Sequence, residues 1–381
     1  MELLGILAFV VALLFSVMVH EFGHYITARK FGMWVSEFFV GFGKRIWSVQ
    51  RGETEFGVKA IPAGGYCKIE GMAPNDEMPE GEEGRAFYKA SSGKKLIVLG
   101  AGSFLHFVLG FVLLFTLFAG IGTNQVLPVI REVVPNSAAQ AAGIQAGDEI
   151  LAINGTKVRE WYKDVEAIRA SKGADLNLEI NRNGEVLTIL TNARLTEIDG
   201  TKRYVLGIIN DVGLKRSGVL LSLKNSAIVT KDFLTESVRS LGKLPEKIPA
   251  LWGATVRGEE RDANGLVGVV GVARVSGEAV GSDKLTPMER LATFVLIVAS
   301  LNIFVGIFNL LPILPLDGGH MAVAIADEIR AFFARLRGRP RPAPIDVTVL
   351  TPITMVVFVV LATLTLLLLV ADVINPVTLN L

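Results

Sequence analysis

The sequence predicts a polytopic α-helical membrane protein that also carries a membrane-associated β-hairpin and an inserted α+β domain. Hydrophobic residues make up 51% of the 381 residues and charged residues only 20%, below the roughly 25% charged residues of soluble domains. The apolar residues are concentrated in four uncharged runs rather than spread along the chain. A long segment of mixed composition separates the second run from the third and predicts the inserted domain.

The four runs are candidates for transmembrane helices, each of which needs ~20 apolar residues. They cover residues 3–19, 96–130, 291–316 and 347–371. The first is long enough if it continues through residues 20–28, which would place ionisable side chains in the membrane. A signal peptide is the alternative for this run, but the run lacks a basic start and an Ala-x-Ala cleavage site.

Positive charge is distributed unevenly among the short loops. Four Lys or Arg residues lie within residues 29–45, and five arginines lie within residues 330–341. Because such residues mark the cytoplasmic side, we expect a multi-pass protein of the plasma membrane with an extracytoplasmic N-terminus. The inserted domain would lie on the same side as the N-terminus.

The inserted segment contains a strand and turn pattern of its own. Gly143-Ile144 is followed by Gly147-Asp148, a short apolar strand and the hairpin turn Asn154-Gly155. This order resembles a bacterial PDZ domain of the circularly permuted type. The resemblance implies that Leu206, Gly207 and Ile208 bind the C-terminal carboxylate of a peptide, which would add as a strand. A small β-rich domain that only spaces or caps its neighbours is the alternative.

Residues 219–257 have apolar positions at helical spacing with Lys and Glu between them. They predict an amphipathic helix, either on the membrane surface or packed within the protein. The expected segments are, in chain order, a first transmembrane helix (1–32), a cytoplasmic β-hairpin and loop region (33–95), a second transmembrane helix (96–121), the PDZ domain (122–212), an extracytoplasmic amphipathic helical region (213–288), a third transmembrane helix (289–316), a cytoplasmic segment (317–346), a fourth transmembrane helix (347–371) and a C-terminal tail (372–381).

A His-Glu-x-x-His motif ends the first run. His20 and His24 are four residues apart, so on a helix both imidazoles lie on one face and can bind one ion. Two imidazoles suit zinc, and a catalytic zinc usually has three protein ligands. Glu21 lies next to His20, where its carboxylate can act on a water at the metal. Ionisable residues at this depth are costly and are usually functional.

The third ligand is expected from the end of the third run. Pro312 and Pro315 interrupt that helix, and Gly318 and Gly319 are expected to let the backbone turn sharply. Asp317 would then point into the helical bundle at the level of the two histidines. The alternative is that Asp317 only caps the helix that follows.

The two motifs together resemble the site-2 protease family of intramembrane zinc metalloproteases, the M50 type. The PDZ insertion is similar to that of the RseP-like members, and the stretch from residue 51 to 62 resembles the actinobacterial form with a single PDZ domain. The resemblance implies one Zn²⁺ per chain bound by His20, His24 and Asp317, and Glu21 as general base. It also implies that Asn309 and the hairpin residues Gly57 and Val58 position the substrate.

The function expected from this resemblance is zinc-dependent hydrolysis of a peptide bond within or near a transmembrane helix. Expected substrates are single-span membrane proteins, with anti-sigma factors already cut by another protease as the implied class, in a stress response based on regulated intramembrane proteolysis. Membrane lipid is the other expected partner. A non-enzymatic scaffold and a metal transporter are the alternatives. The formal charge of +1 gives no sign of nucleic-acid binding, and a single cysteine, Cys67, excludes an internal disulfide.

Overall fold

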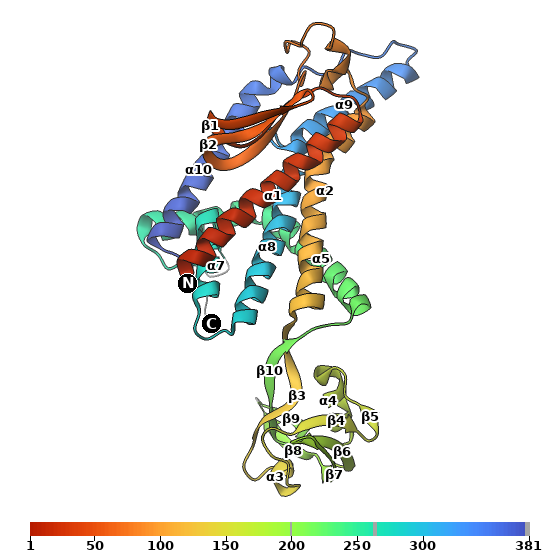
Figure 1. The fold of residues 1–381 in the computed structure, drawn as a ribbon, viewed down its shortest axis with the longest axis vertical. Helices are drawn as coiled ribbons and strands as arrows, with labels where there is room; N and C mark the ends of the chain where they lie inside the picture. Colours follow the sequence, from red (N-terminus) through yellow and green to blue (C-terminus); the bar gives the residue numbers. More distant parts are fainter. Residues whose placement is uncertain (199, 262–264, 378–381) are drawn as a thin grey trace. The chain divides into compact units, whose positions relative to one another are not determined.

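The computed structural model describes residues 1–198, 200–261 and 265–377. Parts of three predicted segments therefore lie outside the described residues: residue 199 of the PDZ domain, residues 262–264 of the amphipathic region and residues 378–381 of the C-terminal tail. The chain divides into two compact units: residues 121–216 form an inserted domain, and the segments before and after it form a helical bundle. Figure 1 shows the elements of both units.

Among the described residues, four helical segments are long and apolar enough to cross a membrane. They are α1 (Glu2–Lys30), α2 (Ser92–Thr116) with the π-helical turn η3 (Leu117–Ile121), α8 (Pro287–Asn309), and the 3₁₀ turn η5 (Val347–Leu350) with α10 (Thr351–Ile374). The predicted class of a polytopic membrane protein with four spans is confirmed. Helix α2 packs against both α1 and α8, and this three-helix arrangement positions the site.

Small residues bring the helices of the bundle close together. A Cβ at Gly23 of α1 would lie 2.6 Å from the carbonyl oxygen of Ala101 in α2, and a Cβ at Gly110 of α2 would lie 2.8 Å from Ile303 in α8. In a membrane, close backbone approach between small residues supplies much of the packing energy between helices. These glycines therefore set the distance between the three helices.

The β-hairpin consists of two long strands, β1 (Val35–Arg51) and β2 (Thr54–Ile69), and it packs beside α1 (Figure 1). The strands fold back on each other, so Phe38 pairs with Cys67 on one side and Phe56 on the other. The far half of β1 pairs with the first half of β2, up to the Arg51–Thr54 pair at the turn. The predicted hairpin is confirmed.

Ion pairs join the end of α1 to the hairpin turn, and join the hairpin turn to the loop that follows β2. That loop contains the short 3₁₀ turns η1 (Glu83–Arg85) and η2 (Phe87–Lys89). Arg85 donates to both carboxylate oxygens of Glu53, at 2.6 and 2.9 Å, and Arg29 of α1 pairs with the same carboxylate. The bidentate pair has a defined geometry and holds the hairpin turn to the loop, and the pair with Arg29 joins that turn to α1.

The remaining helices of the bundle are α5 (Val219–Gly242), α6 (Leu244–Trp252), the π-helical turn η4 (Gly253–Arg257), α7 (Val269–Gly281) and α9 (Asp317–Leu336). Helix α5 packs against α2 and α8, and α7 packs against α1 and α8. Much of the predicted amphipathic region is thus packed on the spans. The side of α5 that carries Leu220 stays exposed.

The inserted domain is built on a six-stranded sheet in the order β10–β3–β4–β6–β7, with β5 paired to β4. Its elements are β3 (Thr123–Val133), α3 (Ala138–Ala141), β4 (Glu149–Ile153), β5 (Thr156–Lys157), α4 (Trp161–Ala170), β6 (Asp175–Arg182), β7 (Glu185–Asn192), the hairpin of β8 (Arg194–Ile198) with β9 (Thr201–Val205), and β10 (Ile208–Lys215). Alternate residues Leu176, Leu178 and Ile180 of β6 are fully buried and form its core.

Candidate metal centre and active site

The two histidines of the sequence motif lie on one face of α1. His20 and His24 are each 7% exposed, and their Nε2 atoms are 3.1 Å apart. The separation of four residues brings the rings together at a T-shaped angle, with centroids 4.7 Å apart. The predicted pair is therefore assembled by local helix geometry alone.

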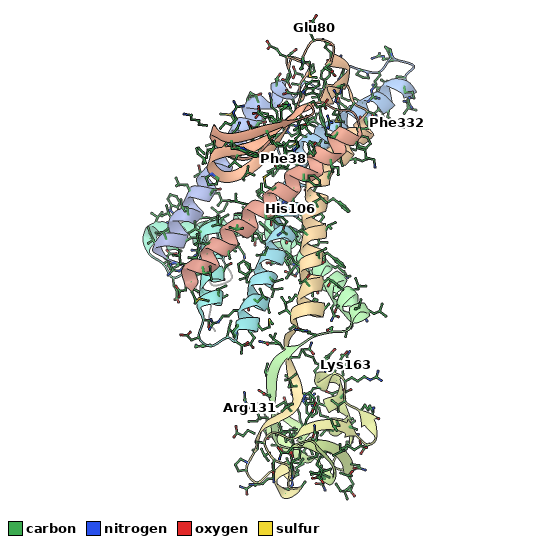
Figure 2. All side chains as sticks on the ribbon, in the orientation of Figure 1. Phe38, Glu80, His106, Arg131, Lys163 and Phe332 are labelled. Carbon is green, nitrogen blue, oxygen red and sulfur yellow. The ribbon has the colours of Figure 1, made fainter. Side chains whose placement is uncertain are left out.

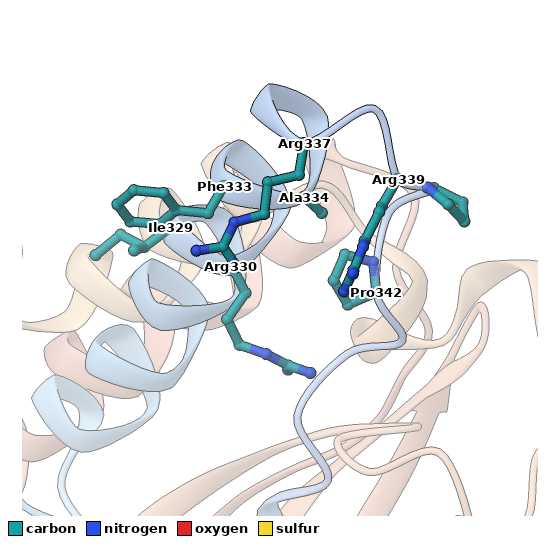
Figure 3. Close-up of a pocket in the computed structure, with 8 residues that line it drawn as sticks. Ile329, Arg330, Phe333, Ala334, Arg337, Arg339 and Pro342 are labelled. Carbon is teal, nitrogen blue, oxygen red and sulfur yellow. The ribbon is translucent and has the colours of Figure 1, made fainter.

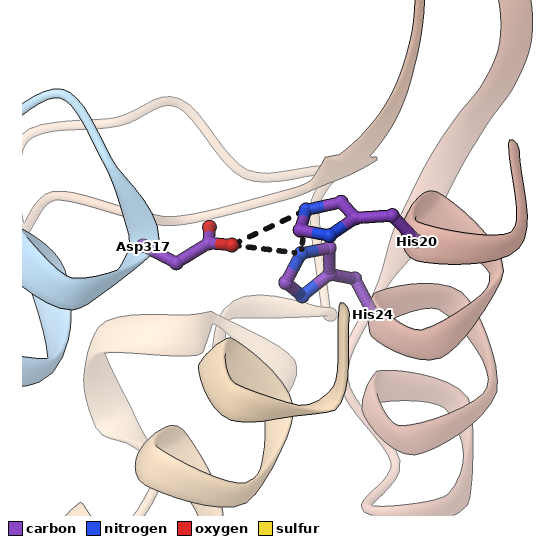
Figure 4. Close-up of side chains that lie close together, drawn as sticks. All are labelled: His20, His24 and Asp317. Atoms are coloured by element: carbon purple, nitrogen blue, oxygen red, sulfur yellow. Dashed lines mark hydrogen bonds and ion pairs between the residues drawn. The ribbon is translucent and has the colours of Figure 1, made fainter. Parts of the chain in front are cut away.

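The carboxylate of Asp317, at the start of α9, completes the group. Its Oδ2 atom lies 3.2 Å from Nε2 of His20 and 3.3 Å from Nε2 of His24 (Figure 4). Within the described residues these three side chains form a group whose ligand atoms all lie within 4.8 Å of one another. The N-cap of α9 is Leu316, which makes no side-chain cap, and the carboxylate of Asp317 is directed at the two histidines (Figure 4).

The donor set fits a metal ion. Nδ1 of His24 contacts the carbonyl oxygen of Val98 at 2.8 Å, and because a carbonyl only accepts, Nδ1 carries the proton and Nε2 has a free lone pair. Oδ2 of Asp317 is buried and has no hydrogen-bond partner among the described residues, despite the two nearby nitrogens. A ring nitrogen with a free lone pair, a second ring nitrogen and a carboxylate oxygen that converge in this way fit a shared cation, and two imidazoles with one carboxylate suit zinc.

Gly102 of α2 lies directly against both imidazoles. A Cβ at this position would lie 2.5 Å from Cε1 of His20 and 2.6 Å from Nε2 of His24. Any side chain there would displace the metal-binding atoms. Gly102 cannot be recognised from the sequence, because nothing in the local pattern of α2 distinguishes it from Gly100.

The two glycines after Asp317 act by close packing rather than by turning the chain. We expected a sharp turn at Gly318 and Gly319, but both lie in the first turn of α9. A Cβ at Gly318 would lie 2.3 Å from the carbonyl of Leu310, and one at Gly319 would lie 2.5 Å from the nitrogen of Leu314. Glycine at both positions lets the start of α9 pack on the α8–α9 connection, which places Asp317.

A cavity of about 320 Å³ adjoins the histidine pair. Glu21, Asn309 and His106 line it together with His20 and Asp317. One oxygen of Glu21, Oε2, accepts a hydrogen bond from the backbone N–H of Cys67 in β2 at 2.9 Å. Burial raises the pKa of the Cys67 thiol, and the nearby Glu21 carboxylate raises it further. Strand β2 thus forms part of the site through its backbone.

The cavity gathers most of the predicted bundle residues, but not those of the hairpin. Gly57 pairs with Phe39 and Ser48, and Val58 pairs with Val40 and Trp47, so both lie in an interior strand segment. Neither lines the cavity. The segment of β2 whose edge reaches the site is residues 65–69, which pair with β1 along one side.

In the inserted domain, Leu206 and Gly207 connect β9 to β10, and Ile208 begins β10. Leu206 is buried, and its carbonyl accepts from the N–H of Ala139. Gly207 has φ of +78°, a conformation that favours glycine. Strand β10 pairs with β3 and lies at the end of the sheet order.

A second cavity, of about 430 Å³, lies at the end of α9 (Figure 3). Arg330, Phe333, Arg337 and Arg339 are among the residues that line it. Its lining includes no His, Cys, Asp or Glu. This cavity therefore offers no metal ligands or general base, and it plays no part in the site above.

Comparison with known proteins agrees with this arrangement. Residues 8–359 match the model of a family described as peptidase family M50. The chain is 33% identical to a protein named zinc metalloprotease Rip1 from Mycobacterium tuberculosis, over 98% of each chain. It is 34% identical to the protein of the same name from Mycolicibacterium smegmatis, over 99% of this chain and 98% of the relative.

Proposed function

This chain belongs to peptidase family M50 and is a zinc metalloprotease of the site-2 type, and we propose that it cleaves its substrates at the cavity beside His20, His24 and Asp317. One observation carries the proposal. Two ring nitrogens from α1 and a carboxylate oxygen from α9 converge within a bundle of apolar helices, next to a carboxylate that is not part of the group.

In this proposal His20, His24 and Asp317 hold one Zn²⁺. When bound there, zinc supplies Lewis acidity, which polarises a carbonyl and lowers the pKa of a water. Val98 keeps His24 in the tautomer with a free Nε2. Gly102 leaves room for both rings.

Glu21 acts as the general base. Its carboxylate takes a proton from the attacking water and passes it to the nitrogen of the leaving amine. The N–H of Cys67 holds Oε2 of Glu21, so Oε1 is the oxygen available to the water. A hydrogen bond from a fixed backbone donor restrains the carboxylate without the entropy cost of ordering another side chain.

The substrates are membrane proteins, and we propose single-span proteins with a helix that unwinds near the cytoplasmic face. A helix conceals its carbonyls in its own hydrogen bonds, so it must open locally before attack. If the opened segment pairs as a strand with the hairpin, that pairing offsets part of the free-energy cost of unwinding the helix. In this proposal Gly57 and Val58 position the substrate by shaping the hairpin, and residues 65–69 form the hairpin edge near Glu21. Asn309 positions the opened segment from the cavity wall.

We place the protein in the plasma membrane with its N-terminus and inserted domain outside the cytoplasm, because the arginine-rich connection between α9 and α10 and the basic end of α1 favour the cytoplasmic side. In that orientation the substrate is trimmed outside first and cut by this protein second. Anti-sigma factors, which act in stress responses, are the substrate class this order suggests.

The inserted domain is proposed to be a PDZ domain that binds peptide C-termini. Strand β10 lies at the end of the sheet order and follows the loop at Leu206 and Gly207. An edge strand after such a loop can accept an added peptide strand, whose carboxylate would contact the backbone N–H groups of Leu206, Gly207 and Ile208.

The decisive experiment compares purified full-length variants for zinc content and for cleavage of a model transmembrane peptide in detergent. Glu21→Gln should retain one zinc per chain and lose about 10²- to 10⁴-fold of the rate, the usual contribution of a general base. Asp317→Ala should lose both zinc and cleavage. Glu2→Gln, which changes an exposed carboxylate on the same helix, is the control.

Undiminished cleavage by Glu21→Gln would overturn the assignment of Glu21 as the general base. A zinc-loaded wild type that cleaves no membrane peptide would favour the alternative of a non-enzymatic scaffold.

A further inference from the structure

A third imidazole borders the cavity, from α2. His106 is 2% exposed, and its ring centroid lies 4.9 Å from that of His20. It lines the cavity together with Glu21 and Asn309, and Figure 2 marks it within the helical bundle. Its nitrogens are not part of the converging metal-ligand group. A buried imidazole beside a catalytic cavity needs a hydrogen-bonding explanation.

A chain of buried hydrogen bonds fixes which nitrogen of His106 carries the proton. Nδ2 of Asn302 in α8 contacts the carbonyl of Val298 at 2.8 Å, and because a carbonyl only accepts, this atom is the amide nitrogen. The same Nδ2 donates to Oγ of Ser16 at 3.0 Å. The Ser16 hydroxyl in turn donates to the carbonyl of Ala12 at 2.8 Å.

Because Nδ2 of Asn302 is the donor in this chain, the Asn302 atom that faces His106 is the amide oxygen. Oδ1 of Asn302 must be the acceptor that contacts Nδ1 of His106 at 2.9 Å, so Nδ1 carries the proton. The other ring nitrogen, Nε2, then has a lone pair and is the nitrogen free to contact a group in the cavity. In this tautomer the ring accepts hydrogen bonds at Nε2 and cannot donate there, so it cannot stabilise an oxyanion.

We propose that Nε2 of His106 accepts a hydrogen bond from a backbone N–H of the substrate segment that occupies the cavity. This inference rests on the proposed function. An opened helix brings unpaired N–H groups into a membrane-embedded site, where an unsatisfied donor costs several kcal/mol. The lining of the cavity also includes the apolar residues Val17 and Val305. A neutral acceptor in a fixed orientation satisfies such a donor without bringing a further charge near the metal ligands.

The test measures binding rather than cleavage, on zinc-loaded full-length protein that carries Glu21→Gln. The probe is a fluorescently labelled single-span peptide that the wild type cleaves. His106→Asn keeps an amide at the position of Nδ1, so the bond to Asn302 survives, but it removes Nε2. We expect about tenfold weaker peptide binding, the effect of losing one buried hydrogen bond. His106→Gln, which places a polar atom near the position of Nε2, should restore most of the affinity.

Ser16→Ala is the matched control, because it removes a buried hydrogen bond of Asn302 but leaves the bond to the carbonyl of Val298, which by itself fixes the orientation of the amide and the tautomer of His106. Its affinity should stay within about twofold of the parent. Unchanged affinity in His106→Asn would overturn the inference, and so would loss of zinc from that variant, which would make His106 part of the metal site. A ¹⁵N spectrum of the wild-type ring that shows a proton on Nε2 would also overturn it, independently of any variant.

The outcomes for the two proposals differ. If the wild type cleaves the peptide and His106→Asn binds it as tightly as the parent, only the role of His106 fails. If the wild type binds the peptide through His106 but cleaves no membrane peptide, the proposed function fails and the binding role stands.

Discussion

The backbone N–H of Cys67 donates a 2.9 Å hydrogen bond to Oε2 of Glu21. This bond joins strand β2 of the hairpin to the catalytic face of α1. It means that the hairpin, which begins five residues after α1 ends, supports the proposed general base as well as the proposed substrate. The thiol of Cys67 has no part in this contact, because the donor is the main chain.

Removal of that N–H should lower activity. Cys67→Pro has no backbone donor, and a hydrogen bond to a charged group contributes about 1.5–3 kcal/mol. We therefore expect cleavage to fall by about 10- to 100-fold with zinc content unchanged. Cys67→Ala keeps the N–H and serves as the control, with near-normal cleavage. Equal rates for the two variants would show that the contact does not matter.

Substitution of Gly102 should weaken metal binding. In Gly102→Ala the new Cβ would meet both imidazoles at 2.5–2.6 Å, so the rings must move. Displaced ligands commonly cost about 10- to 100-fold in metal affinity, measurable by competition with a zinc chelator. Gly100→Ala on the same helix is the control, since its Cβ would meet only Met321 at 3.8 Å. The idea fails if both variants hold zinc as the wild type does.

A buried ion pair should stabilise the fourth span. Arg261 and Asp372 are 2.7 Å apart, with side chains 4% and 0% exposed, and Asp372 also accepts from the N–H of Gly271 in α7. Arg261→Met would leave the aspartate without its partner, so we expect a loss of about 3–5 kcal/mol in unfolding free energy. Thermal unfolding in detergent would measure it. Arg257→Met, from an exposed pair with Glu259, should change little.

The inserted domain should lose stability at low pH. Burial raises the pKa of the Asp148 carboxyl, but hydrogen bonds from Arg182 and from the N–H of Gln145 outweigh burial and lower it below its ordinary value. A carboxyl whose pKa is lower in the folded protein than in the unfolded chain stabilises the fold. This stabilisation is present above the pKa of the unfolded chain, roughly 4, and is lost as the pH falls through the pKa of the folded protein.

Hydrogen exchange of the β6 amides in the full chain would follow this loss. Protection should decrease below about pH 4 once intrinsic exchange rates are taken into account. Asp148→Asn should remove most of this pH dependence and cost about 2 kcal/mol at neutral pH. Glu166→Gln, from the exposed pair with Arg169, should behave like the wild type. Identical acid profiles for Asp148→Asn and the wild type would rule out this carboxylate as the cause.

Much of the architecture follows from the sequence, because the signals are local. The four spans follow from the length of uncharged runs, and the pairing of His20 with His24 follows from the helical repeat. Asp317 could be expected as a partner because prolines interrupt the third run just before it. The PDZ resemblance and the roles of Gly57, Val58 and Asn309 stay predictions.

The tertiary structure alone decided which groups from other elements contact the residues of the site. Cys67 contributes a backbone N–H, which every residue except proline has, so its residue type carries no signal. Gly102 matters because α2 crosses α1 at that point, and His106 matters because Asn302 fixes its tautomer from α8. Such contacts depend on how helices cross and on which donor faces which acceptor. The periodicity of a single segment records only which face of that segment is apolar.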